Sequence, residues 1–204
     1  MTSPKGASPI VSAKPELVLA SESPRRLQLL AQGGLVPARV LGAAIDESAR
    51  QGELPRLHAA RLAKEKALAV ARQVERPVFI LAADTVVACG RRILPKAGSG
   101  DQVRACLARL SGRSHQVITA VALLAPGGKW RQKEVLTRVT FFRLDGEAIH
   151  AYAECGEGIG KAGGYAIQGR AEIFVKQIRG SYSNVVGLPL AVTVAMLKGA
   201  GFPC

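Results

Sequence analysis

The sequence predicts an α/β protein built on a mixed, twisted sheet with flanking helices. Apolar, β-branched runs typical of strands alternate along the chain with longer segments in which apolar residues recur at helical period. The length of 204 residues suits one domain, or two lobes that share one core, and an apolar content of 48% is ample for a packed interior.

The N-terminal residues, 1–15, mix Pro, Gly, Ser and Lys and have no apolar segment of the kind that a secretory signal needs. We expect them to form a disordered extension, and residues 16–204 to form a single domain. The sequence has no apolar run of about 20 residues, the length that spans a bilayer, so no membrane partner is expected.

The first strand is expected at residues 16–20, where a short apolar run leads into a turn. Ser23 is typical of a helix N-cap and Pro24 of the first helical position, and the pair of glycines that begins at Gly33 is typical of a helix end. We therefore expect the first helix between Ser23 and Gly33.

The remaining elements follow from hydrophobic period and from the turn residues between them. Ser99 and Asp145 are the expected caps of two further helices. The expected order is a helix at 57–72, a buried strand at 78–89, a helix from 99 to 112, strands at 115–125 and 135–144 joined by a Pro-Gly-Gly turn, a helix from 145 to 156, a strand at 173–178, a loop at 181–189 and a helix at 190–198.

The formal net charge of +13 favours anionic partners such as nucleotides, nucleic acids or acidic membranes. A merely solubilising surface explains the charge slightly better when composition is considered alone. The basic residues are spread along the chain, and none of the basic stretches is interleaved with aromatic residues as in a single-strand stacking platform. No stable nucleic-acid partner is therefore expected.

The four cysteines form no C-x-x-C pair and have no metal-ligand spacing with the three histidines. We expect inert free thiols in a reducing cytosol, and hence a cytoplasmic protein, rather than a disulfide scaffold or a structural zinc site.

Residues 21–26, Ser-Glu-Ser-Pro-Arg-Arg, place two arginines in the first turn of a predicted helix. Cations oppose the helix dipole at that end, and a bound phosphate would reverse this cost. Serine hydroxyls and backbone amides can bind its oxygens while arginine forks bind them in pairs. A plain capped helix with solvated arginines explains the stretch equally well.

Asp84 interrupts the otherwise apolar strand at 78–89. A buried carboxylate without a partner is costly, so the side chain is expected to face a cleft, where it would bind a metal or act as a base. A structural ion pair with Lys96 or with an arginine is the alternative.

Two glycine-rich stretches, 156–169 and 180–184, suit close backbone approach to a ligand, and Gln168 could read a base edge. Two flexible loops explain them as well. Neither a P-loop nor a G-x-S-x-G nucleophile motif is present in the sequence. On their own, Glu47, Lys66 and Lys96 are ordinary surface charges.

In combination these stretches resemble the Maf family of nucleoside triphosphate pyrophosphatases. Each motif is weak alone, and their order along the chain makes the combination specific. The motifs are LVLASESPRRLQLL (17–30), IDE (45–47), LAKEKAL (62–68), AADTVV (82–87), LSGRSHQVITAVAL (110–123), GEGIGKAGGYAIQG (156–169) and GSYSNVVGLPL (180–190).

The resemblance implies two lobes around a cleft, similar to the inosine triphosphate pyrophosphatase-like fold. It implies hydrolysis of a nucleoside triphosphate to the monophosphate and diphosphate with a divalent cation, Mg²⁺ or Mn²⁺. Asp84 would be the proton acceptor, and Arg25, Thr85 and Gln168 the substrate-specificity residues, in a combination that looks like the dTTP/UTP branch.

With this reading, five side chains are expected to bind phosphate and two to hold the metal. The phosphate-binding residues would be Ser21, Ser23, Arg26, Lys66 and Lys96, and the metal ligands Glu47 and Asp84. The chain departs from the family pattern at Pro95 and Ala97, which flank Lys96, and at Gly160, where the family often carries Asp. The first departure alters a loop, and the second removes a carboxylate.

Other functions stay open. The same fold could act on 7-methyl-GTP, inosine triphosphate or modified nucleotides, and a homodimer is common for such folds. A protein of another class, a non-catalytic nucleic-acid or regulatory binder, would show salt-sensitive binding that is indifferent to Asp84→Asn.

Overall fold

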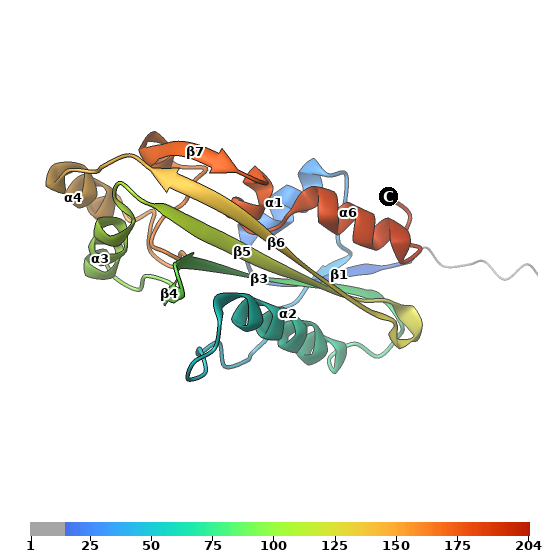
Figure 1. The fold of residues 1–204 in the computed structure, drawn as a ribbon. Helices are drawn as coiled ribbons and strands as arrows, with labels where there is room; N and C mark the ends of the chain where they lie inside the picture. Colours follow the sequence, from blue (N-terminus) through green and yellow to red (C-terminus); the bar gives the residue numbers. More distant parts are fainter. Residues whose placement is uncertain (1–14) are drawn as a thin grey trace, which may run out of the picture.

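The computed structural model describes residues 15–204, whose seven strands form one mixed sheet (Figure 1). The predicted disordered extension, residues 1–15, lies outside the described residues except for Pro15. The strands are β1 (Leu17–Ala20), β2 (Arg39–Val40), β3 (Phe79–Cys89), β4 (Arg92–Leu94), β5 (Ser114–Leu124), β6 (Trp130–Phe141) and β7 (Val175–Arg179).

The sheet has the order β2-β1-β3-β5-β6-β7, with β4 paired to β3. Strand β1 is parallel to β2 and β3, whereas β5, β6 and β7 continue the sheet in antiparallel pairs. The predicted α/β class with a mixed sheet is therefore confirmed.

Helices cover both faces of the sheet. Near β1, helices α1 (Pro24–Gln32) and α6 (Leu190–Gly199) lie on one face and α2 (Pro55–Ala71) on the other, while α3 (Gly100–Leu110) and α4 (Gly146–Glu154) pack together at the far end (Figure 1). No helix of the described residues is long and apolar enough to cross a membrane.

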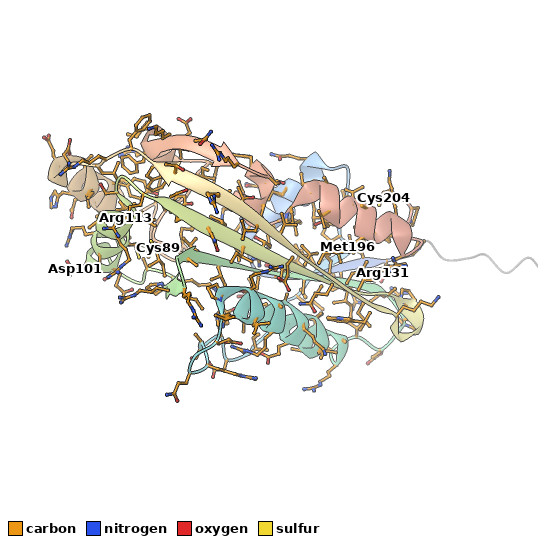
Figure 2. The ribbon with its side chains drawn as sticks, in the orientation of Figure 1. Cys89, Asp101, Arg113, Arg131, Met196 and Cys204 are labelled. Atoms are coloured by element: carbon orange, nitrogen blue, oxygen red, sulfur yellow. The ribbon has the colours of Figure 1, made fainter. Side chains whose placement is uncertain are left out.

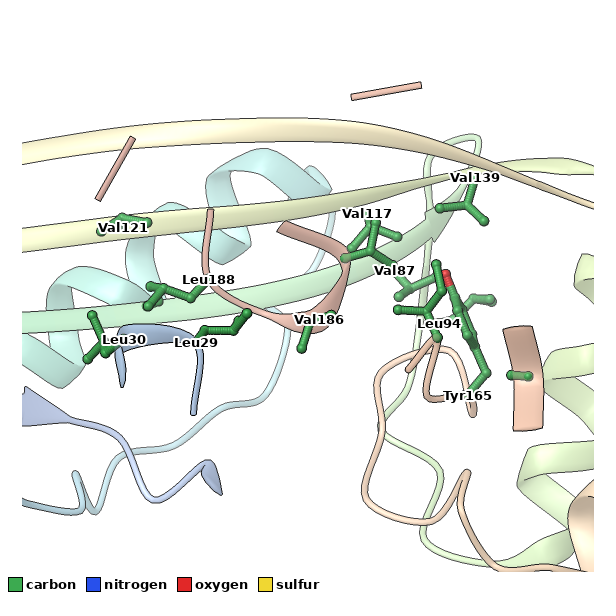
Figure 3. Packing of buried hydrophobic residues seen from close by; sticks show 14 of the residues in the cluster. Leu29, Leu30, Val87, Leu94, Val117, Val121, Val139, Tyr165, Val186 and Leu188 are labelled. Carbon is green, nitrogen blue, oxygen red and sulfur yellow. The ribbon is translucent and has the colours of Figure 1, made fainter. Parts of the chain in front are cut away.

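The two faces of β3 are buried in two different cores. Because successive side chains of a strand point to opposite faces, Ala83 packs in the core that contains α1 and α6, and Ala82 packs in the core beneath α2. Figure 3 shows part of the first core, where Leu29 and Leu30 of α1 lie against β3. The same alternation directs Asp84 toward α2 and Thr85 toward α1.

Most predicted elements are present within a few residues of their expected bounds. Ser99 and Asp145 cap α3 and α4 by accepting hydrogen bonds from Gln102 N and Ala148 N, as predicted. Ser23 occupies the N-cap position of α1, but its side chain makes no capping hydrogen bond.

Three expectations about the elements were wrong. The predicted loop at 181–189 contains a short helix, α5 (Tyr182–Val186), because the Ser181 hydroxyl caps it through Asn184 N. The strand expected at 173–178 begins at Val175, since Arg170–Phe174 forms a 3-10 helix. The strand expected at 135–144 begins earlier and ends earlier, at Trp130–Phe141.

Candidate active site

Asp84 and Thr85 lie at a gap in the hydrogen bonding along one edge of β3. On that edge, β1 pairs as far as Ala82 and β4 pairs from Val87 onward, whereas β5 pairs along the other edge without interruption. The residues between the two short partners therefore have an unpaired edge, and this gap opens onto a cavity. Asp84, Thr85 and Val87 all line it.

A chain of alternating charges runs across this gap. Lys66 of α2 is buried, and its Nζ lies 2.6 Å from Asp84 Oδ1 and 2.6 Å from Glu47 Oε1. The second carboxylate oxygen of Glu47 pairs with Lys96. Asp84 is only 2% exposed, and a buried carboxylate needs a partner. Lys66 supplies it, whereas the structural alternative drawn from the sequence named Lys96 or an arginine.

The carboxylate of Glu47 is stabilised by the two lysines. Burial opposes its ionised form, but hydrogen bonds from Lys66 and Lys96 outweigh that effect and lower the pKa of Glu47 to about 2. Glu47 is therefore charged at any physiological pH, and it joins the loop before α2 to the loop that carries Lys96.

Arg26 is buried and fixed by three hydrogen bonds. Its guanidinium donates to the Gly187 carbonyl at 2.9 Å, to Ser21 Oγ at 3.0 Å and to Thr85 Oγ1 at 3.2 Å. Burial lowers the pKa of Arg26, against the opposing effects of Asp84 and Glu47. Arg26 thus links α1, β3 and the turn after α5. The sequence predicted Arg26 as a phosphate-binding residue, and in the structure it also holds these segments together.

Thr85 has a fully engaged hydroxyl. Besides Arg26, Thr85 Oγ1 lies 2.9 Å from Thr119 Oγ1 and 3.4 Å from the Gly187 carbonyl. Thr119 in turn donates to the Asn184 carbonyl at 3.1 Å. Thr85 therefore joins the strands to α5 at the wall of the cavity.

Arg25 is half-buried at the cavity, and no hydrogen bond joins its side chain to another of residues 15–204. Burial and the neighbouring Arg26 charge lower the pKa of Arg25, and its charge also acts on Lys161 across the cavity. Ser23 lines the same cavity, whereas Ser21 is buried behind it and accepts the hydrogen bond from Arg26.

The glycine-rich loop, residues 156–169, closes the opposite wall. Its backbone pairs with the segment around Lys96: Gly160 N donates to the Ala97 carbonyl at 2.7 Å, and Gly163 N donates to the Pro95 carbonyl at 3.0 Å. This pairing brings Lys161 to the cavity beside Lys96. The sequence marked the stretch, which contains Lys161, as a candidate for ligand approach but gave Lys161 no role, because its place at the cavity depends on backbone hydrogen bonds that side-chain patterns do not encode.

Gln168 lies further along the same loop. Its side chain is exposed, and Gln168 is absent from the described residues that line the cavity. The structure thus brings together all the predicted site residues around one region except Gln168, which lies at the end of the loop that forms one wall.

The resulting central cavity, about 240 Å³ in volume, is strongly basic. Two adjoining cavities of about 370 and 180 Å³ meet it at Lys96, which lines all three. Together they have the size expected of a small-molecule site. Among the described residues that line the central cavity, five are cations and one is an acid: Arg25, Arg26, Lys66, Lys96, Lys161 and Asp84.

No group of three or more metal-binding side chains is found among residues 15–204. Glu47 and Asp84 nevertheless approach one cationic nitrogen, Lys66 Nζ, at 2.6 Å each. Such a pair of hard oxygen donors fits Mg²⁺, which commonly takes one or two carboxylates and completes its shell with water and substrate phosphates.

Known proteins resemble this chain over most of its length. A family model described as "Maf-like protein" matches residues 16–200. A dTTP/UTP pyrophosphatase of Mesorhizobium japonicum is 55% identical over 192 residues, which cover 92% of this chain and 92% of that protein. A dTTP/UTP pyrophosphatase of Nitrobacter winogradskyi is 55% identical over 198 residues, covering 95% of this chain and 96% of that protein.

Solved structures give a more distant likeness. The Staphylococcus aureus Ham1 protein is 14% identical with a TM-score of 0.50, covering 90% of this chain and 98% of that chain. A dITP/XTP pyrophosphatase of Mycobacterium abscessus is 17% identical with a TM-score of 0.45, covering 91% and 95% of the two chains. The Ham1 likeness supports the fold that the sequence predicted.

Proposed function

The chain belongs to the Maf family, and we propose that it is a pyrophosphatase that hydrolyses dTTP and UTP to the nucleoside monophosphate and diphosphate. Relatives that are 55% identical over almost the whole chain bear that name. The observation that carries the proposal is the cavity itself, in which five cations surround one buried carboxylate at the open edge of β3.

The cations are suited to bind a triphosphate. Arg25, Lys96 and Lys161 come from three different segments and line the cavity without being buried in the core. Arginine forks bind phosphate oxygens in pairs and lysines act as point charges. Since the transition state of phosphoryl transfer carries its charge on the phosphoryl oxygens, positioned cations supply most of the catalysis.

Asp84 is suited to be the proton acceptor. A water oxygen forms a bond to the α-phosphorus, the bond from that phosphorus to the bridging oxygen of diphosphate breaks, and the water proton passes to Asp84. Lys66 fixes the Asp84 carboxylate from the α2 side at 2.6 Å. Rigid placement of the acceptor is required because efficient transfer needs hydrogen-bond geometry.

Glu47 and Asp84 would hold Mg²⁺ or Mn²⁺, with phosphate oxygens and water as the other ligands. The metal, when bound, would neutralise charge that develops on the phosphate oxygens. Lys66 Nζ lies between one oxygen of Glu47 and one oxygen of Asp84. A metal ion held by both residues would therefore have to use their other oxygens or displace Lys66 from one of them.

Arg25, Thr85 and Gln168 are our candidates for substrate selection. Arg25 is the most direct, because its side chain lines the cavity and no hydrogen bond to another described side chain holds it. Thr85 would act by fixing Arg26 and the cavity wall. Gln168 would have to approach the base from the exposed end of the loop.

The proposal also concerns the cellular compartment and the partners of the enzyme. The free cysteines Cys89 and Cys204 lie well apart (Figure 2), and all four cysteines are unpaired in the described chain. This suits a reducing cytoplasm. We expect the nucleotide to be the main partner, and a homodimer to be the assembly to test for first.

The decisive experiment is a diphosphate-release assay with dTTP, UTP, 7-methyl-GTP and inosine triphosphate, each with Mg²⁺ or Mn²⁺. We expect dTTP and UTP to be preferred, and Asp84→Asn to lower kcat by about 10²- to 10⁴-fold. Asp101→Asn, at an exposed carboxylate far from the site, is the matched control and should retain full activity. No turnover of any nucleotide, or an Asp84→Asn variant as active as the control, would refute the proposal.

A further inference from the structure

A buried histidine–tyrosine pair lies behind the central cavity and has no part in the steps above. His115 of β5 is 1% exposed, and its Nε2 is hydrogen-bonded to the Tyr165 hydroxyl at 2.7 Å. Tyr165 belongs to the glycine-rich loop and lines the cavity. Its side chain reaches from the loop toward the strands, near Val87 and Val139 (Figure 3).

Aromatic packing encloses this pair. The ring of Phe141 lies edge-on to both the His115 and Tyr165 rings, with centroid distances of 5.0 Å to each. Among the described residues, His115 Nδ1 has no hydrogen-bond partner. The Tyr165 hydroxyl is thus the single side-chain partner of the imidazole within residues 15–204, and movement of the loop would leave a buried polar ring unsatisfied.

The loop that Tyr165 fixes is closely fitted to the sheet. Gly163 has φ +70°, and a Cβ on it would lie 2.7 Å from Val87 Cγ1. Three residues earlier, Gly160 binds the Ala97 carbonyl, and the Ala97 amide binds the Lys161 carbonyl at 3.1 Å. The loop and the Lys96 segment therefore form one unit, and the position of that unit sets where two phosphate-binding lysines lie.

We propose that His115 and Tyr165 are positioning residues, a buried anchor that holds the glycine-rich loop so that Lys96 and Lys161 can bind the triphosphate. The proposal rests on the pyrophosphatase function above. The anchor is neutral rather than a proton relay: burial lowers the pKa of His115 to about 4 and raises the pKa of Tyr165 above its usual range. Neither group touches the reacting atoms.

The test compares Tyr165→Phe with Tyr182→Phe, a matched change at an exposed tyrosine of α5. In the protein without nucleotide, we expect Tyr165→Phe to speed hydrogen–deuterium exchange in the peptide 156–169, and Tyr182→Phe to leave it unchanged. In the active enzyme, Tyr165→Phe should raise KM for dTTP about 5- to 50-fold and change kcat less than about threefold, because a lost buried hydrogen bond weakens binding while Asp84 stays in place.

A second pair of variants separates positioning from folding. His115→Leu removes the hydrogen bond to Tyr165 and should raise KM for dTTP. His115→Gln retains a hydrogen-bonding group toward Tyr165, so its KM should rise less. An unchanged KM for Tyr165→Phe in an active enzyme overturns the proposal, as does unchanged exchange in the loop, even if the variant unfolds at lower temperature. If the wild-type protein hydrolyses no nucleotide, the pyrophosphatase function fails, and the exchange experiment alone decides whether the anchor exists.

Discussion

Lys66 is buried and pairs with the buried Asp84 and with the partly exposed Glu47, so replacing Lys66 should change the stability of the protein. Asp84 is 2% exposed and has Lys66 as its ion-pair partner. Breaking a buried pair on one side leaves an uncompensated charge. We predict that Lys66→Met lowers the free energy of unfolding by about 3–5 kcal/mol, as measured by urea denaturation.

The double variant Lys66→Met with Asp84→Asn should recover part of this loss, because the buried charge is then gone. The control is Arg104→Met, which breaks exposed pairs with Asp101 and Glu154 and should cost less than about 1 kcal/mol. Equal stabilities for the single and double variants would contradict the account of the Lys66–Asp84 pair.

The buried His115 makes stability depend on pH in a window of its own. Burial lowers its pKa to about 4 from the ordinary 6.5, so below pH 6.5 the unfolded state binds a proton that the folded state does not. The contribution of His115 to the free energy of unfolding should therefore be constant above pH 6.5. It should fall by up to about 3 kcal/mol as the pH decreases toward 4. Denaturation at pH 7.5, 6.0 and 5.0 measures the slope.

The control for this prediction is His115→Gln, which cannot titrate. The slope between pH 6.5 and 4.5 should become shallower in that variant. Glu47 does not interfere, because its stabilising effect, with a pKa of about 2, is complete above pH 4.5 and is lost only as the pH falls further. An equal slope in both proteins would show that another group is responsible.

At the residue level, the sequence predicted some of the site but not the partners within it. A single acid in an apolar strand was sufficient to mark Asp84, since burial of a carboxylate needs a reason. Lys66 and Glu47 look like surface charges in sequence and were assigned only through the family resemblance. Lys161 was noted within the glycine-rich stretch but given no role, because it approaches Lys96 through backbone pairing with residues 95–97.

At the level of secondary structure, the sequence did not predict two short strands, β2 and β4, and β4 bounds the gap at the site. The β2 strand has two residues and β4 has three, too few to show a hydrophobic period, and they are strands only because β1 and β3 supply partners. The predicted long strand at 78–89 was right to within one residue. The gap at Asp84 arises from where β1 ends and β4 begins, which is a property of strand pairing rather than of β3 itself.

Two glycines of the glycine-rich loop, Gly160 and Gly163, differ in how closely they approach neighbouring residues. Gly163 and Gly160 both have positive φ, +70° and +72°, but an added Cβ would lie 2.7 Å from Val87 at Gly163 and would meet nothing within 4 Å at Gly160. We predict that Gly160→Ala costs about 1 kcal/mol of backbone strain, whereas Gly163→Ala costs a further 1–3 kcal/mol, roughly, from overpacking.

Thermal unfolding of the two alanine variants, without nucleotide, measures this difference. Both changes add one methyl group and impose similar backbone strain, so each serves as the control for the other. If Gly163→Ala were as stable as Gly160→Ala, the loop would not be pressed against β3 in the way that the structure shows.

At the scale of the whole molecule, the net charge of +13 has two components. Many basic residues are scattered, as Arg113 and Arg131 are at opposite ends of the sheet (Figure 2), and they give a general attraction for anions. Five others converge on one cavity with a single lining acid. A nucleic-acid binder would use the scattered basic residues, and a triphosphate enzyme would use the five that line the cavity. Experiments can therefore distinguish the two functions.

We predict that KM for dTTP rises several-fold when NaCl is raised from about 50 to 500 mM, with little change in kcat, because screening weakens the approach and binding of the triphosphate. Steady-state kinetics at constant Mg²⁺ measures both constants. Asp84→Asn should still bind dTTP in a salt-dependent manner, since all five cations that line the cavity remain in that variant. A short DNA duplex should not compete at concentrations far above the dTTP KM. Tight, salt-sensitive DNA binding that ignores Asp84→Asn, in a protein without turnover, would instead make the scattered charge the functional one.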